Sequence, residues 1–199
     1  MSRRPKHKRA PLLIDLFAWY VLPAYTLLFA GSVTWFGTNF SVIAVTGETH
    51  YRGFFLWGLL AGGYFLFVLW DLASVLPQRG KWLLRLLAGA AVLCLAAALA
   101  VPYLPELAPR WADLHVVLAF TACTLLMAAV LFLLLYLRRR APACARGLLP
   151  AWVGIVLGCL ILFCLCGIIS SALEIFFTLS TAHLVRILWR RCRGNISQI

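Results

Sequence analysis

The sequence predicts an all-α integral membrane protein, a bundle of six transmembrane helices with both termini in the cytoplasm. Of its 199 residues, 64% are hydrophobic and only 12% are charged, which leaves too little polar surface to cover a soluble fold. Apolar runs of about 17 to 25 residues, the length that crosses a bilayer, recur along the whole chain. The six expected spans are 11–36, 54–76, 82–104, 112–137, 149–168 and 170–189.

The basic residues predict the orientation of these spans. Sixteen of the 18 Lys and Arg residues fall on one side of the membrane in this arrangement, and only Arg52 and Arg110 fall on the other. The sixteen are Arg3, Arg4, Lys6, Lys8, Arg9, Arg79, Lys81, Arg85, Arg138, Arg139, Arg140, Arg146, Arg186, Arg190, Arg191 and Arg193. Because Lys and Arg are retained on the cytoplasmic side during insertion, residues 1–10 and 190–199 are predicted to be cytoplasmic tails of a membrane domain at 11–189.

The same charges indicate the expected partners and location. The formal net charge is +12, but the basic residues lie next to helix ends rather than in a separate basic domain. This placement favours anionic lipid headgroups on the cytoplasmic side as partners, and it argues against nucleic acid. We expect a multi-pass protein of a bacterial cell membrane, with a second membrane protein or another copy of the chain as further possible partners.

Taken in order, the spans carry features of membrane helices. The first follows a basic tail as a signal peptide does, but its apolar stretch is about twice as long as a signal-peptide core, so we expect it to stay attached. The second contains Gly58 and Gly62, and the fifth contains Gly154 and Gly158. Glycines four residues apart give a helix a flat surface, which favours close packing against another helix.

Two ionisable residues lie inside spans at the outer side. His115 and Glu174 are each about four residues into their spans, which places both roughly 6 Å below the surface at the rise of an α-helix. Ionisable groups at this depth are site candidates by default. Together with residues of the first outer loop and the start of the fourth span, they form the candidate ligand or lipid-headgroup pocket: Asn39, Glu48, His50, Asp113, His115 and Glu174.

Several interpretations of these outer residues remain open. The most economical is a structural hydrogen-bonded pair of His115 with Glu174. The spacing of Ser171 and Glu174 also fits a capping box at the start of the last helix. Two His and several carboxylates are a permissible but unspecific set of metal ligands, and we predict no metal or other cofactor.

A second group of polar residues lies near the cytoplasmic side, and it comprises Asp15, Asp71, Arg85, His183 and Arg186. Asp71 precedes the turn at Pro77 and Arg85 follows it at similar depth, which predicts a salt bridge between the second and third spans. The other three residues are expected to reach the membrane surface, to pair with each other, or to line a proton path, and we favour the first two roles.

Catalytic motifs are missing from the sequence. It contains no G-x-S-x-G, no P-loop, no H-E-x-x-H and no paired C-x-x-C. Its seven cysteines are expected to be packing residues within helices or to lie on the cytoplasmic side, which argues against a disulfide framework. We therefore predict no catalytic residue.

Three segments resemble a known family. They are T-N-F-S-V-I-A-V-T-G-E-T-H-Y-R-G-F-F-L-W-G at 38–58, L-H-V-V-L-A-F at 114–120 and S-A-L-E-I-F-F at 171–177. They resemble the outer loop, the start of the fourth span and the start of the last span in the DRAM-like superfamily and its bacterial six-helix relatives. The outer loop differs in having no Ser-Asp before its Gly. The resemblance implies a six-helix membrane protein, linked in eukaryotic relatives to lipid and membrane-trafficking roles.

The function predicted from these observations is that of a non-enzymatic membrane protein that binds or organises lipid or a partner membrane protein. A small transporter or channel subunit is the alternative from another class, although the chain lacks clear repeat symmetry or broken spans. An intramembrane lipid-modifying enzyme that uses His115 and Glu174 is the third.

Overall fold

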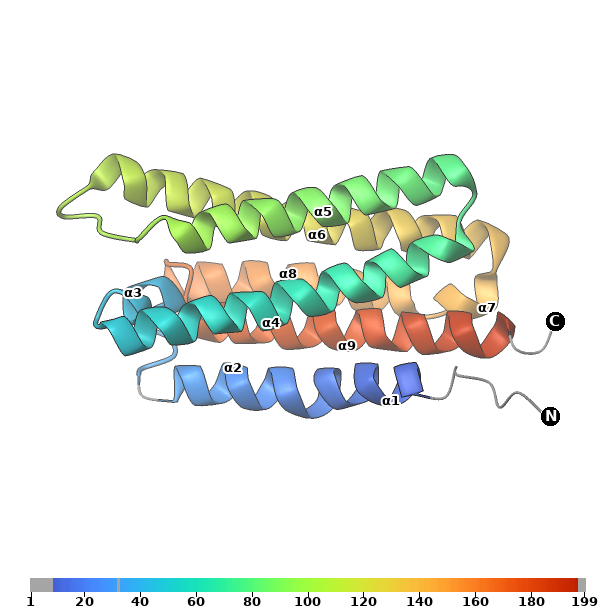
Figure 1. The fold of residues 1–199 in the computed structure, drawn as a ribbon, viewed down its shortest axis with the longest axis horizontal. Coiled ribbons are helices and arrows are strands. Elements are labelled where there is room, and N and C mark those ends of the chain that lie inside the picture. Colours follow the sequence, from blue (N-terminus) through green and yellow to red (C-terminus); the bar gives the residue numbers. More distant parts are fainter. Residues whose placement is uncertain (1–8, 32, 197–199) are drawn as a thin grey trace, which may run out of the picture.

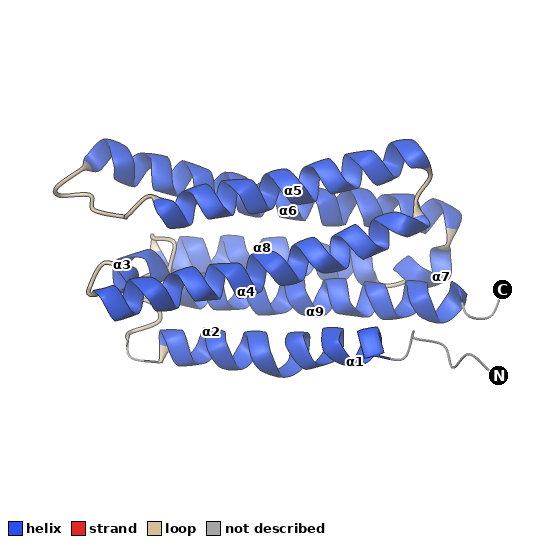
Figure 2. Ribbon diagram, viewed as in Figure 1, coloured by secondary structure: helices blue, strands red, loops and turns tan. Residues whose placement is uncertain are grey.

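The computed structural model describes residues 9–31 and 33–196, and it is helical throughout these ranges apart from short turns and loops (Figures 1 and 2). The α-helices are α1 (Arg9–Leu16), α2 (Leu22–Ala30), α3 (Phe40–Ala44), α4 (Glu48–Leu72), α5 (Gln78–Ala100), α6 (Pro109–Arg140), α7 (Pro142–Ala145), α8 (Leu148–Cys166) and α9 (Ser171–Ile196). A π-helical turn, η2 (Phe17–Val21), joins α1 to α2, and a 3₁₀ turn, η3 (Ala73–Val75), follows α4.

Six helices are long and apolar enough to cross a membrane, as predicted. They are Leu12–Ala30, Glu48–Val75, Gln78–Ala100, Pro109–Arg140, Pro142–Cys166 and Ser171–Gly194. The first helix ends at Ala30 and the second begins at Glu48, earlier than predicted, because part of the intervening loop folds into α3 and part extends α4. The last helix continues to Ile196, so residues 190–196 of the predicted tail are helical. Of the predicted tails, residues 1–8 and 197–199 lie outside the described residues.

The long helices run up and down, so that the molecule has two distinct ends (Figure 1). We call the end where α1 begins and α9 ends the basic end, and it also carries the α4–α5 turn and α7. The opposite end, which we call the loop end, carries α3 and the segments 101–108 and 167–170. The sequence pattern thus places Arg52 and Arg110 near the loop end and the clusters 79–85, 138–146 and 186–193 at the basic end.

A proline explains the irregular turn in the first long helix. Pro23 has no backbone N–H, so the helix cannot form the usual hydrogen bond from residue 23 to the carbonyl of Trp19. The turn from Phe17 to Val21 widens instead, and the N–H of Leu22 donates to the carbonyl of Phe17, five residues back. The helix therefore continues through α2 without interruption.

Small residues determine how closely α4 approaches α5. Gly58 and Gly62 of α4 both face α5, as their spacing predicts. A Cβ at Gly58 would overlap the Leu99 side chain, lying 2.9 Å from its Cδ2, and a Cβ at Gly62 would lie 3.2 Å from Leu95 Cδ2. In the fifth span, Gly158 faces Phe176 of α9, whereas Gly154 has open space around it. Three of the four glycines therefore permit close helix contacts.

Candidate functional site

The short helix α3 is docked inside the loop end. Phe40 is fully buried, and its ring contacts those of Phe29 and Trp57 edge-on, at centroid distances of 5.2 and 5.0 Å. The side chain of Asn39 caps the helix by accepting a hydrogen bond from the N–H of Val42 at 2.8 Å. A loop helix with so much buried apolar surface is a fixed part of the bundle.

His115 of α6 holds α3 through its side chain. It is 4% exposed, and its Nε2 lies 2.7 Å from the hydroxyl oxygen of Ser41. Its Nδ1 lies 2.9 Å from the carbonyl oxygen of Ala98 and 2.8 Å from that of Val101, at the end of α5. Carbonyl oxygens only accept, so Nδ1 carries a proton, and in the neutral ring Nε2 accepts from the Ser41 hydroxyl. Both ring nitrogens are therefore used.

The side chain of Glu174 in α9 binds the backbone of the same helix, α3. Its Oε2 accepts a hydrogen bond of 2.7 Å from the N–H of Phe40, one of the donors that a helix start leaves without a partner inside the helix. The segment before α3 is tied to α9 as well, because the carbonyl of Thr38 accepts from the N–H of Ser171 at 2.7 Å. The last helix and the outer loop are thus joined side by side.

These contacts correct two predictions for Glu174. The predicted hydrogen bond between His115 and Glu174 is wrong, because the two side chains bond adjacent residues of α3 instead of each other. The capping box of Ser171 with Glu174 is also wrong. The hydroxyl of Ser170 accepts from the N–H of Leu173, at 3.4 Å, while the hydroxyl of Ser171 donates to Thr38. Depth along a helix is readable from sequence, but the inserted helix that separates these residues is not.

A cavity of about 760 Å³ lies between the helices, on the side of α3 that faces the basic end. Side chains of α4, α5, α6, α8 and α9 line it, and almost all of them are apolar, including Phe65, Leu95 and Trp152. Its size falls within the range of about 300 to 1,000 Å³ typical of small-molecule sites. Ser41, His115 and Glu174 lie among its lining residues at the loop end.

The cavity opens sideways between α6 and α8. The lining residues Phe120 of α6 and Leu160 and Phe163 of α8 are 67%, 54% and 46% exposed, whereas those on α4 are mostly buried. Closer to the basic end the two helices are linked, since Trp152 Nε1 donates to the carbonyl of Met127 at 3.1 Å. The opening is therefore lateral and apolar, on the side surface of the bundle.

One polar residue of the cavity was missed by the sequence analysis. Thr178 lies one helical turn beyond Glu174, so both are on the same face of α9, and both line the cavity. Thr178 is only 3% exposed, and its hydroxyl makes no hydrogen bond to any described residue. The i, i+4 spacing of Glu174 and Thr178 is the signal in the sequence that indicates this neighbour.

The remaining members of the predicted pocket lie elsewhere. Glu48 and His50 are exposed at the start of α4, where Glu48 pairs with Arg52 at 2.5 Å and His50 Nδ1 lies 2.6 Å from the hydroxyl of Thr46. Asp113 is exposed on α6 and does not line the cavity, and Asn39 serves as the cap of α3. Of the six predicted residues, the structure brings His115 and Glu174 to the cavity.

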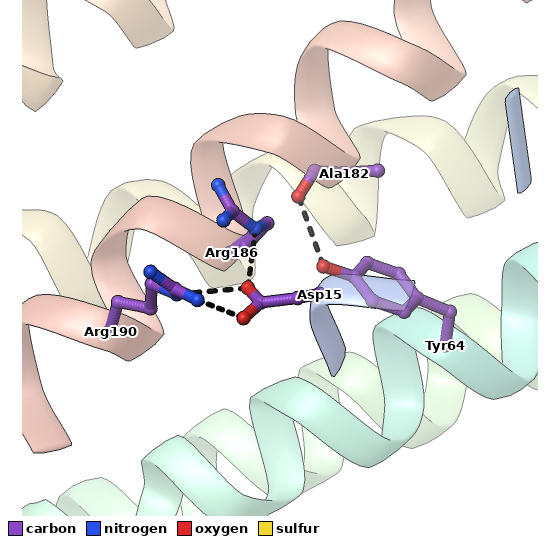
Figure 3. A network of polar contacts seen from close by, with 5 residues as sticks. All are labelled: Asp15, Tyr64, Ala182, Arg186 and Arg190. Carbon is purple, nitrogen blue, oxygen red and sulfur yellow. Dashed lines mark hydrogen bonds and ion pairs between the residues drawn. The ribbon is translucent and has the colours of Figure 1, made fainter. Parts of the chain in front are cut away.

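At the basic end, Asp15 joins the first long helix to the last (Figure 3). Its Oδ1 accepts from Arg186 Nε at 2.7 Å, and the carboxylate also pairs with Arg190. Nearby, the hydroxyl of Tyr64 donates to the carbonyl of Ala182 at 3.1 Å. His183 packs edge-on against Trp19, with centroids 4.4 Å apart, and so contributes a ring contact rather than an ion pair.

The predicted salt bridge between Asp71 and Arg85 is wrong. Asp71 pairs with Arg193 of α9, and its Oδ2 accepts from Trp189 Nε1 at 2.6 Å. The guanidinium of Arg85 lies 4.5 Å from the ring centroid of Trp70, the residue before Asp71. Neighbours in a helix point about 100° apart, so the α5 side chain meets position 70 while position 71 faces α9.

The side chains at the cavity offer few polar groups. Among the residues in the described ranges, no three His, Cys, Asp or Glu side chains are grouped so that they could hold a metal ion. What the site offers is a large apolar volume with a carboxyl and a hydroxyl on one wall. No protein-family model, no curated protein and no solved structure matches the chain.

Proposed function

We propose that this chain is a multi-pass membrane protein whose cavity receives the hydrocarbon chain of a lipid through the opening between α6 and α8. The supporting observation is the cavity itself, which is about 760 Å³ in volume, almost wholly apolar and open at the side of the bundle. In a membrane that side faces lipid, so a lipid chain enters without passing through water. The role is one of binding or organising lipid, without a chemical step.

The membrane and its orientation are part of the proposal. The helices are long and apolar enough to cross a bilayer, and the basic clusters 79–85, 138–146 and 186–193 lie at the end where α9 finishes. From the retention of Lys and Arg in the cytoplasm we infer that this end, with both termini, lies on that side. Reporter fusions after residue 199 and within 138–147 should then report a cytoplasmic location, and fusions within 101–108 an external one.

Three narrower points stay with the proposal. The basic end offers positive charge to anionic headgroups on the cytoplasmic side. A bacterial cell membrane is the proposed location, and a second copy of the chain or another membrane protein is a proposed further partner. Membership of the DRAM-like superfamily rests on the three quoted segments and would fit a lipid-related role.

Photolabelling tests the cavity. The purified protein is reconstituted in phosphatidylcholine nanodiscs that contain a lipid with a diazirine in its acyl chain, irradiated, and mapped by mass spectrometry. We expect labels on cavity residues such as Phe65 and Leu126, which are only 5% and 7% exposed, whereas lipid around the outside of the bundle reaches exposed side chains. Labels on the outer helix faces are expected as background.

A matched pair of variants separates cavity from surface. Ala119 lines the cavity, whereas Ala97 is exposed on α5 and does not line it. Ala119→Trp fills part of the volume and should reduce the cavity labels about tenfold, the effect of roughly 1.4 kcal/mol of lost binding. Ala97→Trp should leave them unchanged. Equal labelling of the cavity in both variants, or labels confined to the outer faces of the wild-type protein, would contradict the proposal.

A further inference from the structure

We infer that the ligand of this cavity carries a primary ammonium group at the end of its hydrocarbon chain, and that Glu174 binds this group. The inference rests on the proposed function and specifies the chemical class of the ligand. Among the described residues that line the cavity, Glu174 is the one acid, and no Lys or Arg is present.

Glu174 differs from the other partly buried acids of the described bundle. Asp15 pairs with Arg186 and Arg190, and Asp71 pairs with Arg193. Within the described ranges, Glu174 has no ion-pair partner, and its carboxyl takes part in a single hydrogen bond, from the N–H of Phe40 to Oε2. A carboxylate whose second oxygen is free at an apolar wall lacks the ion pair or further hydrogen bonds that buried charged groups normally have.

Thr178 supplies a second free polar group at the same wall. Thr178 is only 3% exposed and lies one turn along α9 from Glu174. Its hydroxyl forms no hydrogen bond within the described part of the chain. A threonine hydroxyl both donates and accepts, and an ammonium group has three N–H donors and no acceptor. One ammonium can therefore donate to the free oxygen of Glu174 and to the hydroxyl of Thr178.

The remaining polar groups at the loop end do not compete for this ligand. His115 uses both ring nitrogens within the protein, and the Ser41 hydroxyl is its partner. An anionic headgroup at the same wall would meet the carboxylate of Glu174 without a compensating cation. The wall thus favours a cationic donor over a phosphate or a fatty-acid carboxylate.

Competition against the photolabel tests the inference. Dodecylamine, dodecanol and dodecanoate, which share one chain and differ in the terminal group, are titrated against the diazirine lipid in phosphatidylcholine nanodiscs. In the wild-type protein, dodecylamine should displace the cavity label at about tenfold lower concentration than dodecanol, as expected for a hydrogen bond to a charged group. Dodecanoate should be the weakest competitor.

Glu174→Gln is the matched variant, because its amide oxygen still accepts from the N–H of Phe40 while the charge is lost. The ratio of dodecanol to dodecylamine concentrations at half displacement should fall about tenfold in this variant. Partitioning of each competitor into the nanodisc is the same for both proteins, so it cancels in the comparison. Thr178→Val should lower the ratio about threefold, and it decides the matter if the Gln variant does not fold.

The outcomes keep the two proposals apart. An unchanged ratio in Glu174→Gln, or in Thr178→Val if that variant alone folds, refutes the ammonium assignment while the cavity label upholds lipid binding. Strongest displacement by dodecanoate refutes it too. Absence of any displaceable label in the cavity refutes the proposed function itself.

Discussion

Replacing His115 with Ala should be among the most destabilising changes at the loop end. The substitution removes the partner of the Ser41 hydroxyl and of the Val101 carbonyl, at a site where the histidine is 4% exposed. It also removes one of the two partners of the Ala98 carbonyl, which keeps the N–H of Val101. A lost hydrogen bond costs about 0.5 to 1.5 kcal/mol, and a buried group left without a partner about 1 to 3 kcal/mol. The expected loss of unfolding free energy is therefore about 2 to 4 kcal/mol.

The assay is a titration of the purified protein with sodium dodecyl sulfate in mixed micelles, followed by tryptophan fluorescence. Ser41→Ala should cost about 1 kcal/mol, and the double variant should lose about 1 kcal/mol less than the sum, because both changes remove one shared bond. His50→Ala is the control, since His50 is exposed at the start of α4, and it should shift stability by no more than about 0.5 kcal/mol. Strict additivity, or a loss for His115→Ala no larger than that control, would refute this account of α3.

Two further predictions concern the helix contacts and use the same titration. Gly58→Ala should destabilise the protein by about 1 to 3 kcal/mol, because the added Cβ overlaps the buried Leu99. Gly63→Ala is the control, since a Cβ there meets nothing within 4 Å, and it should be neutral or slightly stabilising. Equal effects of the two changes would contradict the described α4–α5 contact. Asp71→Asn should cost about 1 to 3 kcal/mol through the loss of its ion pair with Arg193. Adding Arg85→Gln should have an independent, additive effect, because Arg85 contacts Trp70. Recovery of stability in the double variant would instead be evidence for a salt bridge between Asp71 and Arg85.

The number and course of the long helices could be predicted because they depend on local properties. Length, hydropathy and Gly spacing are read directly from the chain, and they gave six long apolar helices and the close contact at Gly58. Depth could be counted as well, so His115 and Glu174 were rightly placed near one end. Each of these inferences needs only one helix at a time.

The partners of Asp71, His115 and Glu174 could not be predicted, because they depend on how helices are rotated and on what lies between them. Asp71 and Arg85 have matching depth, but Asp71 faces α9 and Arg85 meets Trp70. Between His115 and Glu174 lies α3, a helix of five residues in a stretch whose sequence predicts a loop. The cavity is the most remote from sequence, since it arises from side chains of five helices that leave space together.

The most direct test of the account is a crystal structure of the protein grown from a lipid phase that contains dodecylamine. It should show continuous chain-shaped density in the cavity between α6 and α8, with its nitrogen within hydrogen-bonding distance of Glu174 and Thr178. A cavity closed by movement of α8 onto α6, or one filled only with ordered water, would contradict the claim that this space exists to hold a lipid chain.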